Sequence, residues 1–402
     1  MLQFDVSQFI KTNITKRNTS LFLSDLDNNR NQLTREIRGK KVLVIGGAGT
    51  IGSSFIKALL PYKPSSLIVV DYSENGLTEL TRDLRSQDIY VPEEYITYPF
   101  DFGSRVFEKM FLSRSFDVVA CFAAHKHVRS EKDHLAIEAM ITNNVFNTKS
   151  LLDLCTQRKP KHFFSVSTDK AANPVNVMGA SKQLMEKVLL SYSADLKVTT
   201  ARFANVAFSN GSLLAGFIDR MMKRQPLSAP NDVKRYFVSP EESGQLCLLA
   251  CILGSSGEIL FPKLDVSQMM TFSGIAEDFL ESLGLEPKQC QSEQEARVTA
   301  KLRNVDDHTY PVYFFSTDTS GEKAFEEFYT RVDDVDMEHF EAMGIVKKSS
   351  HPDIINLESI INKLKMAFER QDVEKSDIVR LIAELLPNFR HKETGKSLDQ
   401  KM

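Results

Sequence analysis

The sequence predicts an α/β fold in which a mainly parallel sheet is covered by helices on both faces, and two observations carry this prediction. Short, continuous apolar runs alternate along the chain with segments whose apolar residues recur at helical spacing. The runs lack the polar alternation of a half-exposed strand, as is typical of strands buried on both faces. Such a pattern indicates βαβ units, in which each helix crosses the sheet to the next parallel strand.

The individual elements follow from these runs. Strands are expected at residues 41–47, 66–71, 96–100, 116–124, 162–168 and 198–206. Helices are expected between them, at residues 53–60, 75–86, 104–114, 134–157 and 181–193. Residues 205–330 are less regular and contain the one strongly loop-like stretch, residues 223–237.

These patterns divide the chain into four parts. We expect an N-terminal arm (1–39), a core (40–205), a mixed region interleaved with the core (206–331), and a charged helical extension with a frayed tail (332–402). Within the arm, residues 8–23 are amphipathic. They either pack on the main domain or on a second subunit, or form a loosely held terminus.

The composition is that of a water-soluble globular chain. Apolar residues make up 42% and charged residues 26% of 402, and 50 basic against 53 acidic residues leave a net charge of −3. This balance argues against a nucleic-acid or anionic-membrane surface. No apolar run approaches the roughly 18 residues of a membrane span, and residues 1–13 lack the features of a signal peptide. We therefore expect a cytoplasmic protein.

The five cysteines predict reduced, buried thiols. They are odd in number and scattered through apolar stretches. Cys247 and Cys251 share one face of an expected helix, but no second Cys/His pair beside them completes a zinc site. His125 and His127 are two residues apart, and they too lack a further ligand, since no matching carboxylate stands near them in the sequence. No metal centre is expected.

The first apolar run ends in a glycine-rich loop that points to a dinucleotide site. Gly46, Gly49 and Gly52 stand in the spacing G-x-x-G-x-x-G, after an expected strand and before an expected helix. Glycines let the backbone approach a pyrophosphate, and the helix N-terminus, with Thr50 and Ile51, offers free N–H groups. This context predicts a Rossmann-like doubly wound sheet. The alternative is a glycine turn with a purely structural role.

The end of the second expected strand indicates the cofactor. Asp71 follows the last glycine by about 20 residues, where an acidic side chain bonds the adenosine ribose. Residues 72–74 include no Lys or Arg to hold a 2′-phosphate, so NAD is favoured over NADP. The alternative is that Asp71 is only a charge at a helix N-terminus. Asp101, at the end of the third expected strand, is placed to reach the adenine.

Residues 165–182 hold the chemically richest set of side chains. They begin at the C-terminal end of an expected strand, where ligands bind in open parallel sheets. Thr168, Asp169, Lys170 and Lys182 are expected to converge beside the nicotinamide. A hydroxyl, a carboxylate and two ammonium groups suit proton transfer coupled to hydride transfer.

At this point the chain resembles a known family, the extended short-chain dehydrogenase/reductases of the polysaccharide-biosynthesis group, and within it the soluble UDP-N-acetylglucosamine 4,6-dehydratases. The segment STDKAANPVNVMGASK, residues 167–182, is similar to that group's signature. Further similar motifs lie at residues 123–128, 143–145, 202–206, 235–237 and 321–327. Together the motifs span roughly residues 40–330, in the family's order.

The resemblance implies an NAD-dependent enzyme of surface-polysaccharide or glycan biosynthesis. Such enzymes oxidise the sugar at C4, eliminate water across C5 and C6, and return the hydride to C6, which gives a 4-keto-6-deoxy sugar. The resemblance implies Asp169 as the acid for C6 departure and a candidate C4 base, and Lys170 as the C5 base. It also implies that Thr168 bonds the C4 oxygen and that Lys182 bonds the nicotinamide ribose.

Two of these positions carry an alternative. A basic Lys170 requires a pKa depressed by burial or by nearby cations, and the alternative is a simple Asp169–Lys170 ion pair. Met178 stands where most short-chain dehydrogenases carry an acid/base Tyr, four residues before Lys182. A thioether carries no proton, but a subset of the resembled dehydratases has the same Met. The alternative there is a pseudoenzyme.

The resemblance places further residues around the two ligands. For the cofactor these are Ala123 and Ala124. For the nucleotide sugar these are Lys126, His127, Asn205, Lys234 and Arg235. The two basic residues at 234 and 235 suit a diphosphate. In the family an Arg-Pro pair usually precedes the motif at 321–327, and residues 318–320 replace it here, which puts one phosphate contact in doubt.

Other functions stay open at this stage. A C4 or C5 epimerase is compatible with the same fold, and so is a non-catalytic NAD-dependent binding protein. The stereochemistry at C5 and the choice among UDP, GDP and dTDP sugars are also open. We expect a homo-oligomer, because this fold commonly pairs helices such as 135–157 and 174–193 between subunits. For the extension after 332, the alternatives are partner binding and a solvated helical cap.

Overall fold

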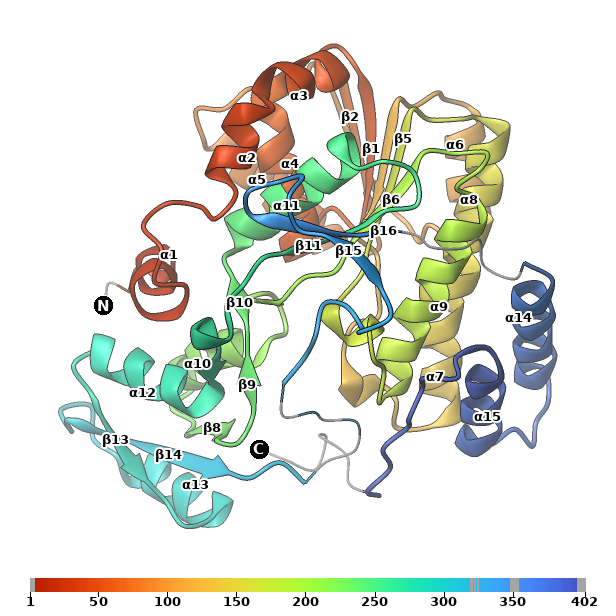
Figure 1. Ribbon diagram of the computed structural model, residues 1–402. Helices are drawn as coiled ribbons and strands as arrows, with labels where there is room; N and C mark the ends of the chain where they lie inside the picture. The colour runs from red at the N-terminus through yellow and green to blue at the C-terminus, as the bar shows by residue number, and fades with distance from the viewer. Residues whose placement is uncertain (1–3, 319–320, 322, 324, 348–353, 396–402) are drawn as a thin grey trace.

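The computed structural model describes the chain except residues 1–3, 319–320, 322, 324, 348–353 and 396–402. Its centre is a nine-stranded sheet with the order β15-β16-β11-β6-β5-β4-β1-β2-β3 (Figure 1). The strands from β11 to β3 run parallel, and β16 and β15 add an antiparallel edge. These strands are β1 (Lys41–Ile45), β2 (Ser66–Asp71), β3 (Glu94–Pro99), β4 (Val118–Cys121), β5 (His162–Val166), β6 (Val198–Ala201), β11 (Ile259–Pro262), β15 (Asp334–Asp336) and β16 (Met343–Lys347).

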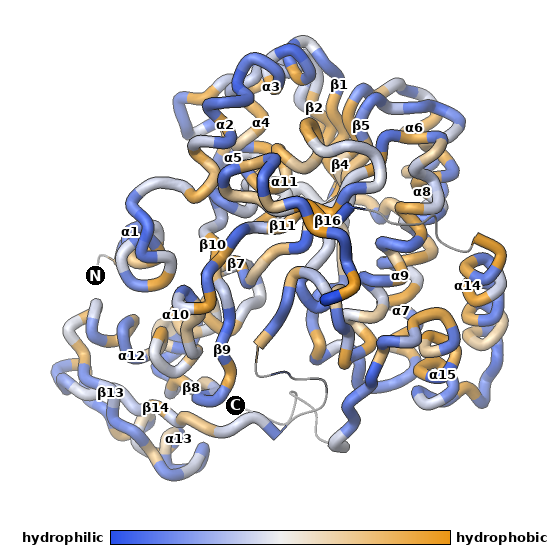
Figure 2. The backbone as a smooth tube through the Cα atoms, viewed as in Figure 1, coloured by the Kyte–Doolittle hydropathy of each residue, from blue (hydrophilic) through white to orange (hydrophobic). Residues whose placement is uncertain are grey.

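Helices cover both faces of this sheet and create two apolar cores. The first face carries α3 (Arg30–Ile37), α4 (Thr50–Leu59), α5 (Glu74–Arg85) and α11 (Pro240–Leu253). The second carries α6 (Arg105–Leu112), α7 (His134–Ile141), α8 (Asn147–Gln157) and α9 (Val177–Ser191). Figure 2 shows the hydrophobic residues gathered in the strands between these layers.

Strand β1 explains why the sequence shows continuous apolar runs. Val42 and Val44 belong to the core under the first helical layer, whereas Leu43 and Ile45 belong to the core under the second. Successive side chains of a strand point to opposite faces, so a strand covered on both faces is apolar at every position. The predicted doubly wound α/β fold is therefore confirmed.

The strand order reverses at β1, which lies between β4 and β2. The chain proceeds from β1 through β2 to β3 on one side, and from β4 through β5 to β6 on the other. In open parallel sheets this reversal leaves a crevice beyond the carboxyl ends of the strands, where ligands bind. The segments that follow β1, β4 and β5 all reach that edge.

A smaller mixed region lies below the main sheet in Figure 1. Its three-stranded sheet has the order β13-β14-β8. Strands β8 and β14 and helices α10 and α12 contribute to a third apolar core, and α13 packs against β14. These elements are α10 (Leu213–Met222), β8 (Leu227–Pro230), α12 (Phe272–Ser282), β13 (Glu286–Gln289), α13 (Glu293–Leu302) and β14 (Thr309–Phe315). Two short strand pairs connect it to the core, β7 (Asn205–Val206) with β10 (Phe237–Val238) and β9 (Lys234–Arg235) with β12 (Met270–Thr271).

The described part of the N-terminal arm packs on the chain itself. Helix α1 (Val6–Phe9) and the π-helical turn η1 (Ile10–Ile14) bury apolar side chains in the third core, where the Phe9 and Phe279 rings are 6.0 Å apart. Helix α2 (Leu23–Asn28) is fixed through Asp25, whose carboxylate accepts the backbone N–H groups of Glu341 and Ala342. Of the alternatives for this arm, these contacts favour packing on the main body over a loosely held terminus.

Two expectations about irregular and helical segments are wrong in part. The stretch 223–237 contains β8 and β9 and leads directly into β10, so it is not simply a loop. Residues 334–336 and 343–347 form β15 and β16 of the main sheet, although the sequence predicts a helical extension from 332. The extension becomes helical only at α14 (Ile354–Phe368) and α15 (Lys375–Leu385). The four-part division of the chain stays a prediction.

Helices α14 and α15 cover α9 and α7 (Figure 1). Their buried residues, among them Leu357, Leu364 and Ile382, extend the second core outward. Part of the surface expected to pair between subunits is thus occupied by the chain's own extension, so the extension is not only solvated. The homo-oligomer stays a prediction. Among the described residues, no helix combines the length and apolar character that crossing a bilayer requires.

Candidate active site

The glycine loop after β1 is folded as a phosphate cradle. Gly46 has a φ of +74°, and a Cβ on it would lie 2.5 Å from the backbone nitrogen of Ala123. A Cβ on Gly52 would lie 2.3 Å from the carbonyl oxygen of Gly46. Both positions therefore exclude any side chain. Helix α4 begins at Thr50 with no side-chain cap, which leaves its first N–H groups for an anion.

Asp71 lies at the carboxyl end of β2, directly beside this loop. Its buried carboxylate accepts the backbone N–H of Ala48 at 3.0 Å and that of Ser73 at 2.9 Å. The aspartate thus fixes the glycine loop to the second strand, in addition to any contact with a ribose. The residues fit a dinucleotide of the NAD type, because the N-terminus of α4 has no side-chain cap and a carboxylate stands at the end of β2, where a ribose is expected.

Asp101 is exposed, and its carboxylate accepts the backbone N–H of Gly103 at 2.6 Å in the turn after β3. Ala123 and Ala124 follow β4 and are half-buried, with Ala123 against Gly46. The four strand ends β1 to β4 therefore bring all the residues predicted for the cofactor to one edge of the sheet, apart from Lys182. Their contacts with a cofactor stay predictions.

A buried asparagine, which has no assigned role in the sequence, connects this edge to α9. Asn144 accepts the backbone N–H of His125 and donates to the carbonyl of His125 and to Ser181 Oγ, at 2.9, 3.0 and 2.9 Å. It lies in η4 (Thr142–Phe146), a π-helical turn between α7 and α8. Such turns often mark functional sites. The sequence predicts one helix at 134–157, and the structure has α7, the π-helical turn η4 and α8 there in succession. Asn144 lies in the π-helical turn.

A second buried network positions the end of β5. Ser167 Oγ donates to Glu186 Oε1 at 2.6 Å, and both oxygens of Glu186 accept from Arg202, at 2.8 and 2.6 Å. Arg202 also donates to the carbonyl of Phe328 at 2.9 Å. A bidentate arginine–carboxylate pair is geometrically specific. It joins the segments after β5 and β6, helix α9, and the segment around 328.

Asp169 is buried at the start of η5 (Asp169–Ala171), a single turn of 3₁₀-helix. Its Oδ1 accepts from Thr168 Oγ1 at 2.8 Å, from the backbone N–H of Lys170 at 2.9 Å and from Lys170 Nζ at 3.2 Å. Three of the four predicted groups of this segment thus meet at one carboxylate.

Lys170 differs from the prediction in its electrostatics. Burial lowers the pKa of Lys170, but Asp169 and Glu326 outweigh burial and Arg235, so its pKa is raised overall. Its Nζ lies 3.2 Å from Asp169 Oδ1 and 3.8 Å from Glu326 Oε1. The depressed pKa that a basic Lys170 requires is therefore not found in this state, because two carboxylates lie close to the ammonium group. The ion-pair alternative describes this state.

Glu326 is a further residue of this site to which the sequence patterns assign no role. It is buried, and burial raises its pKa, with Asp169 acting in the same direction and Lys170, Arg235 and Lys323 against it. It lies in the quoted motif 321–327, which was the available signal. The motif alone does not show that this carboxylate reaches Lys170, more than 150 residues earlier in the chain.

Arg235 is buried and directed into the protein. Its Nη1 donates to the carbonyls of Lys234 and Lys323, at 2.9 and 3.0 Å, and its Nη2 lies 3.9 Å from Glu326 Oε1. Lys234 is exposed beside it. Arg235 therefore compensates a buried carboxylate, a role that the sequence does not predict, whereas its predicted diphosphate contact stays a proposal.

Lys182 occupies a very different environment in α9. It is buried, and burial lowers its pKa to about 8 against the opposing effects of Cys121 and Glu186. Its Nζ is 2.9 Å from the sulfur of Met185. Met178, one turn earlier, is buried in the second apolar core. Asp169 and Lys170 thus form one charged group, and Lys182 stands apart from it in an apolar setting.

Two of the remaining predicted substrate residues, Lys126 and His127, lie against the loop at 209–212. Lys126 Nζ donates to the carbonyl of Asn210 at 3.1 Å, and Thr50 Oγ1 accepts the backbone N–H of Asn210 at 2.9 Å. His127 faces Gly211, and Asn205 stands in β7. The loop therefore connects the glycine cradle to the predicted sugar side of the site.

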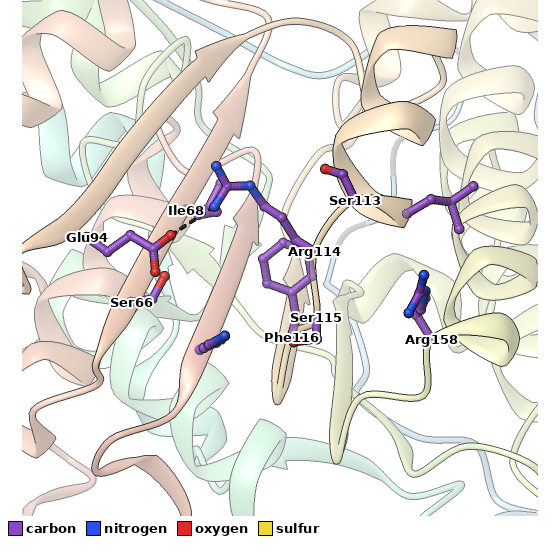
Figure 3. A pocket seen from close by; sticks show the side chains of 10 residues that line it. Ser66, Ile68, Glu94, Ser113, Arg114, Ser115, Phe116 and Arg158 are labelled. Atoms are coloured by element: carbon purple, nitrogen blue, oxygen red, sulfur yellow. Dashed lines mark hydrogen bonds and ion pairs between the residues drawn. The ribbon is translucent and has the colours of Figure 1, made fainter.

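A pocket at the opposite edge of the sheet is separate from this site (Figure 3). It is lined by the first residues of β1, β2 and β3, namely Lys41, Ser66 and Glu94, and by Arg114 and Arg158. Arg114 and Glu94 pair across it at 2.8 Å. Because ligands of parallel sheets bind at the carboxyl ends, this amino-end pocket is not the candidate site.

Sequence comparison relates the chain to proteins of polysaccharide biosynthesis. The sequence profile of the family described as polysaccharide biosynthesis protein matches residues 42–348. A Methanocaldococcus jannaschii protein described as an uncharacterized membrane protein is 36% identical over 56% of this chain and 67% of its own length. The inverting UDP-N-acetylglucosamine 4,6-dehydratase of Campylobacter jejuni is 29% identical over 56% of this chain and 67% of its own length.

Other relatives are longer. The Staphylococcus aureus capsular polysaccharide biosynthesis protein CapD is 29% identical over 63% of this chain, which spans only 42% of CapD. Among solved structures, Pen from Bacillus thuringiensis superposes with a TM-score of 0.63 at 23% identity, over 78% of this chain and 89% of Pen. DesIV from Streptomyces venezuelae gives 0.55 at 20% identity, over 72% and 88%. These superpositions confirm the fold.

Proposed function

The chain belongs to the polysaccharide biosynthesis protein family, and from that premise we propose that it is an NAD-dependent 4,6-dehydratase of UDP-N-acetylglucosamine. Its relatives include nucleotide-sugar dehydratases and epimerases, so the chain is a member of that group of enzymes. The observation that carries the proposal is the cluster of Thr168, Asp169 and Lys170 at the carboxyl end of β5, in which the Asp169 carboxylate is buried and bonds both neighbours.

The roles of these residues follow from what dehydration requires. NAD⁺, when bound, supplies a hydride acceptor for C4 and a hydride donor for C6. Gly46, Gly52 and Asp71 would hold it at the carboxyl edge, and Lys182 would bond the nicotinamide ribose. Thr168 would bond the C4 oxygen, and Asp169 would take the C4 hydroxyl proton and later protonate the departing C6 hydroxyl. Lys170 would remove the C5 proton.

A dehydratase is favoured over an epimerase by the number of acid/base groups. Inversion at C4 needs one group that removes and returns the hydroxyl proton, and most enzymes of this fold use a Tyr at the position of Met178. Elimination of water needs further groups at C5 and C6. Asp169, Lys170 and the nearby Glu326 are sufficient for this, whereas the buried Met178 contributes no proton. A protein that only binds NAD would not need this cluster.

Mass spectrometry of UDP-N-acetylglucosamine incubated with the purified protein and NAD⁺ tests the proposal. We expect the sugar nucleotide to lose the mass of one water, with no net accumulation of reduced cofactor. NMR of the product would then give the C5 configuration, and GDP and dTDP sugars would give the base preference. An unchanged mass with an altered C4 configuration would identify an epimerase instead.

A further inference from the structure

The buried carboxylate of Glu326 faces an unusual set of charges. Three cations approach it from three segments, Lys323 at 3.6 Å, Lys170 at 3.8 Å and Arg235 at 3.9 Å. Asp169, bound to the same Lys170, is the second acid of the cluster. All three cations lie beyond ordinary hydrogen-bond distance, so none of them saturates the carboxylate.

One oxygen of this carboxylate has no hydrogen bond within the part of the chain that the structure describes. Glu326 Oε2 is buried and finds no hydrogen-bond partner among the described residues. A buried polar atom without a partner is costly, and native structures retain one where it has a use. Lys323 lies nearest this oxygen, whereas Lys170 approaches the other oxygen, Oε1, at 3.8 Å. The carboxylate can therefore take a proton from Lys170 at Oε1 while Oε2 stays without a hydrogen bond.

The segment that carries Glu326 is firmly held. Arg235 donates to the carbonyl of Lys323, and Arg202 donates to that of Phe328, at 3.0 and 2.9 Å. Asn176, in the loop after Lys170, donates to the carbonyl of Gly321 at 2.8 Å. Contacts on both sides thus fix Glu326 beside Lys170, so their closeness does not depend on a loose surface loop.

We propose that Glu326 is the proton acceptor that converts Lys170 from an ammonium group to the amine that removes the C5 proton. This inference rests on the dehydratase function proposed above. It explains how Lys170 acts as a base although two carboxylates favour its charged form. Glu326 does not touch the substrate in this proposal; it acts on the reaction only through the protonation state of Lys170.

The proton transfers balance. The Lys170 ammonium gives one proton to the Glu326 carboxylate, leaving an amine and a carboxylic acid. The amine takes the C5 proton, the C5–H electron pair forms the C5–C6 double bond, and the C6–O bond breaks. The leaving hydroxyl departs as water with the proton from Asp169. The hydride returns to C6 and Lys170 returns its proton to C5. Glu326 then gives its proton back to Lys170.

Substrate binding supplies the driving force for the first transfer. A bound nucleotide sugar excludes water from Lys170 and Glu326, and a buried ion pair loses solvation that a neutral pair does not need. The groups facing Glu326, namely Asp169, Lys170, Arg235 and Lys323, stay in place during this change. The neutral pair is therefore expected in the substrate complex, while the ion pair is expected in the free enzyme.

The test compares Glu326→Gln with Glu327→Gln, a neighbouring exposed carboxylate that binds only the Asn173 side chain in this region. With NAD⁺ and UDP-N-acetylglucosamine in D₂O, Glu326→Gln should oxidise C4 and form reduced cofactor. Its C5 deuterium incorporation and water loss should fall about 100-fold or more at pH 7. Glu327→Gln should match the parent protein.

The pH profile separates a proton acceptor from a structural carboxylate. Removing a negative charge beside Lys170 lowers its pKa, so a carboxylate that merely holds the ammonium would leave turnover unchanged or faster in Glu326→Gln. The proposal predicts a slow variant whose elimination rate rises as pH is raised above neutral, because Lys170 then loses its proton to solvent. A variant as fast as the parent protein at pH 7 would overturn the inference.

Infrared difference spectra give a readout that does not need turnover. Adding UDP-N-acetylglucosamine to the NAD-loaded protein should produce a carboxylic-acid C=O band that Glu326→Gln lacks and Glu327→Gln keeps. If the parent protein dehydrates the sugar but shows no such band, this inference fails while the proposed function stands. If none of the nucleotide sugars loses water, the dehydratase proposal fails. The presence or absence of the carboxylic-acid band in the parent protein still shows whether Glu326 takes a proton. Thermal unfolding, NAD binding and the Glu326→Asp variant, which should recover part of the rate, control for misfolding.

Discussion

The two lysines of the candidate site lie in opposite kinds of surroundings. Lys182 is buried among apolar groups, and its pKa is lowered to about 8. Lys170 is half-buried between two carboxylates, and its pKa is raised. The difference shows that burial alone does not determine the charge of a lysine. The neighbouring groups determine whether burial removes the proton or retains it.

The two ends of the site also differ in how they are assembled. The cofactor end is built from neighbouring strands of the first part of the chain, with the glycine loop after β1 bonded to Asp71 at the end of β2. The acid/base end joins segments that are far apart in the chain, with Lys170, Arg235 and Glu326 meeting across them. Changes at the first end should therefore act on cofactor binding, and changes at the second on chemistry.

The sharpest test of this separation is at the acid/base end. Asp169→Asn or Lys170→Met should lower product formation by about 10³-fold or more, because each removes a proton-transfer group. NAD affinity should stay within about twofold, since neither residue lies in the glycine cradle. Steady-state kinetics and calorimetric titration with NAD⁺ measure the two effects. Retention of most of the turnover in either variant would show that the assigned roles are wrong.

Lys182→Met tests the environment of the other lysine. The lowered pKa means that the folded protein disfavours the charged form, at a cost of about 3 kcal/mol for a shift from 10.5 to about 8. The variant without cofactor should be more stable than the parent protein at pH 7, by up to that amount. Between about pH 8 and pH 10.5, Lys182 is protonated in the unfolded parent protein but mostly neutral in the folded one. The free energy of unfolding of the parent protein should therefore rise with pH and approach that of the variant. Denaturant unfolding at several pH values checks the sign, and a less stable variant at pH 7 would contradict it.

Gly52→Ala tests the cofactor end. Its Cβ would lie 2.3 Å from a backbone oxygen, so the loop must shift away from the phosphates. We expect NAD affinity to fall about 100-fold, or roughly 2.7 kcal/mol. In Gly49→Ala the nearest atom lies at 3.4 Å, so that variant should lose less. Equal losses in the two variants would mean that the close approach at Gly52 is unimportant.

Phe389→Ala tests the extension, with the smallest expected effect. Phe389 is buried in the second core, and the residues around it bond the loop after Lys170, with Asn388 donating to the carbonyl of Ala172 at 3.2 Å. Loosening this anchor should lower turnover about tenfold and leave NAD affinity unchanged. Hydrogen exchange at residues 172–176 should increase in parallel. Ile355→Ala, on the exposed side of α14, is the control and should change neither.

Several features of the molecule were predictable because their signals are local. The apolar runs predict the strands, since each strand is buried on both faces, and the glycine spacing predicts the cradle after β1. Thr168, Asp169 and Lys170 are adjacent in the chain, so their proximity needs no knowledge of the fold. The resemblance to the polysaccharide-biosynthesis group is confirmed by the family match.

Other features depend on contacts between distant segments and were not predictable from patterns. β16 pairs antiparallel with β11 on one side and with the edge strand β15 on the other, and its short apolar run is flanked by charged residues. The environment of Lys170 depends on Glu326, which no local pattern places beside it. The direction of the Lys170 pKa shift could not be predicted for this reason, because it depends in part on a carboxylate from another part of the chain.

The hydrogen bonds between the extension and the loop after Lys170 affect the order in which the two ends of the site can form during synthesis. The backbone N–H of Lys392 donates to the carbonyl of Val175, that of Arg390 to Pro174, and Asn388 lies 216 positions after its partner Ala172. At roughly 5–20 residues per second, a ribosome needs on the order of 10–40 s to traverse that interval. During this time a nascent chain already holds its glycine cradle, whereas the loop beside Lys170 waits for the last part of the polypeptide. Cofactor binding is therefore expected to precede catalytic competence in each newly made molecule.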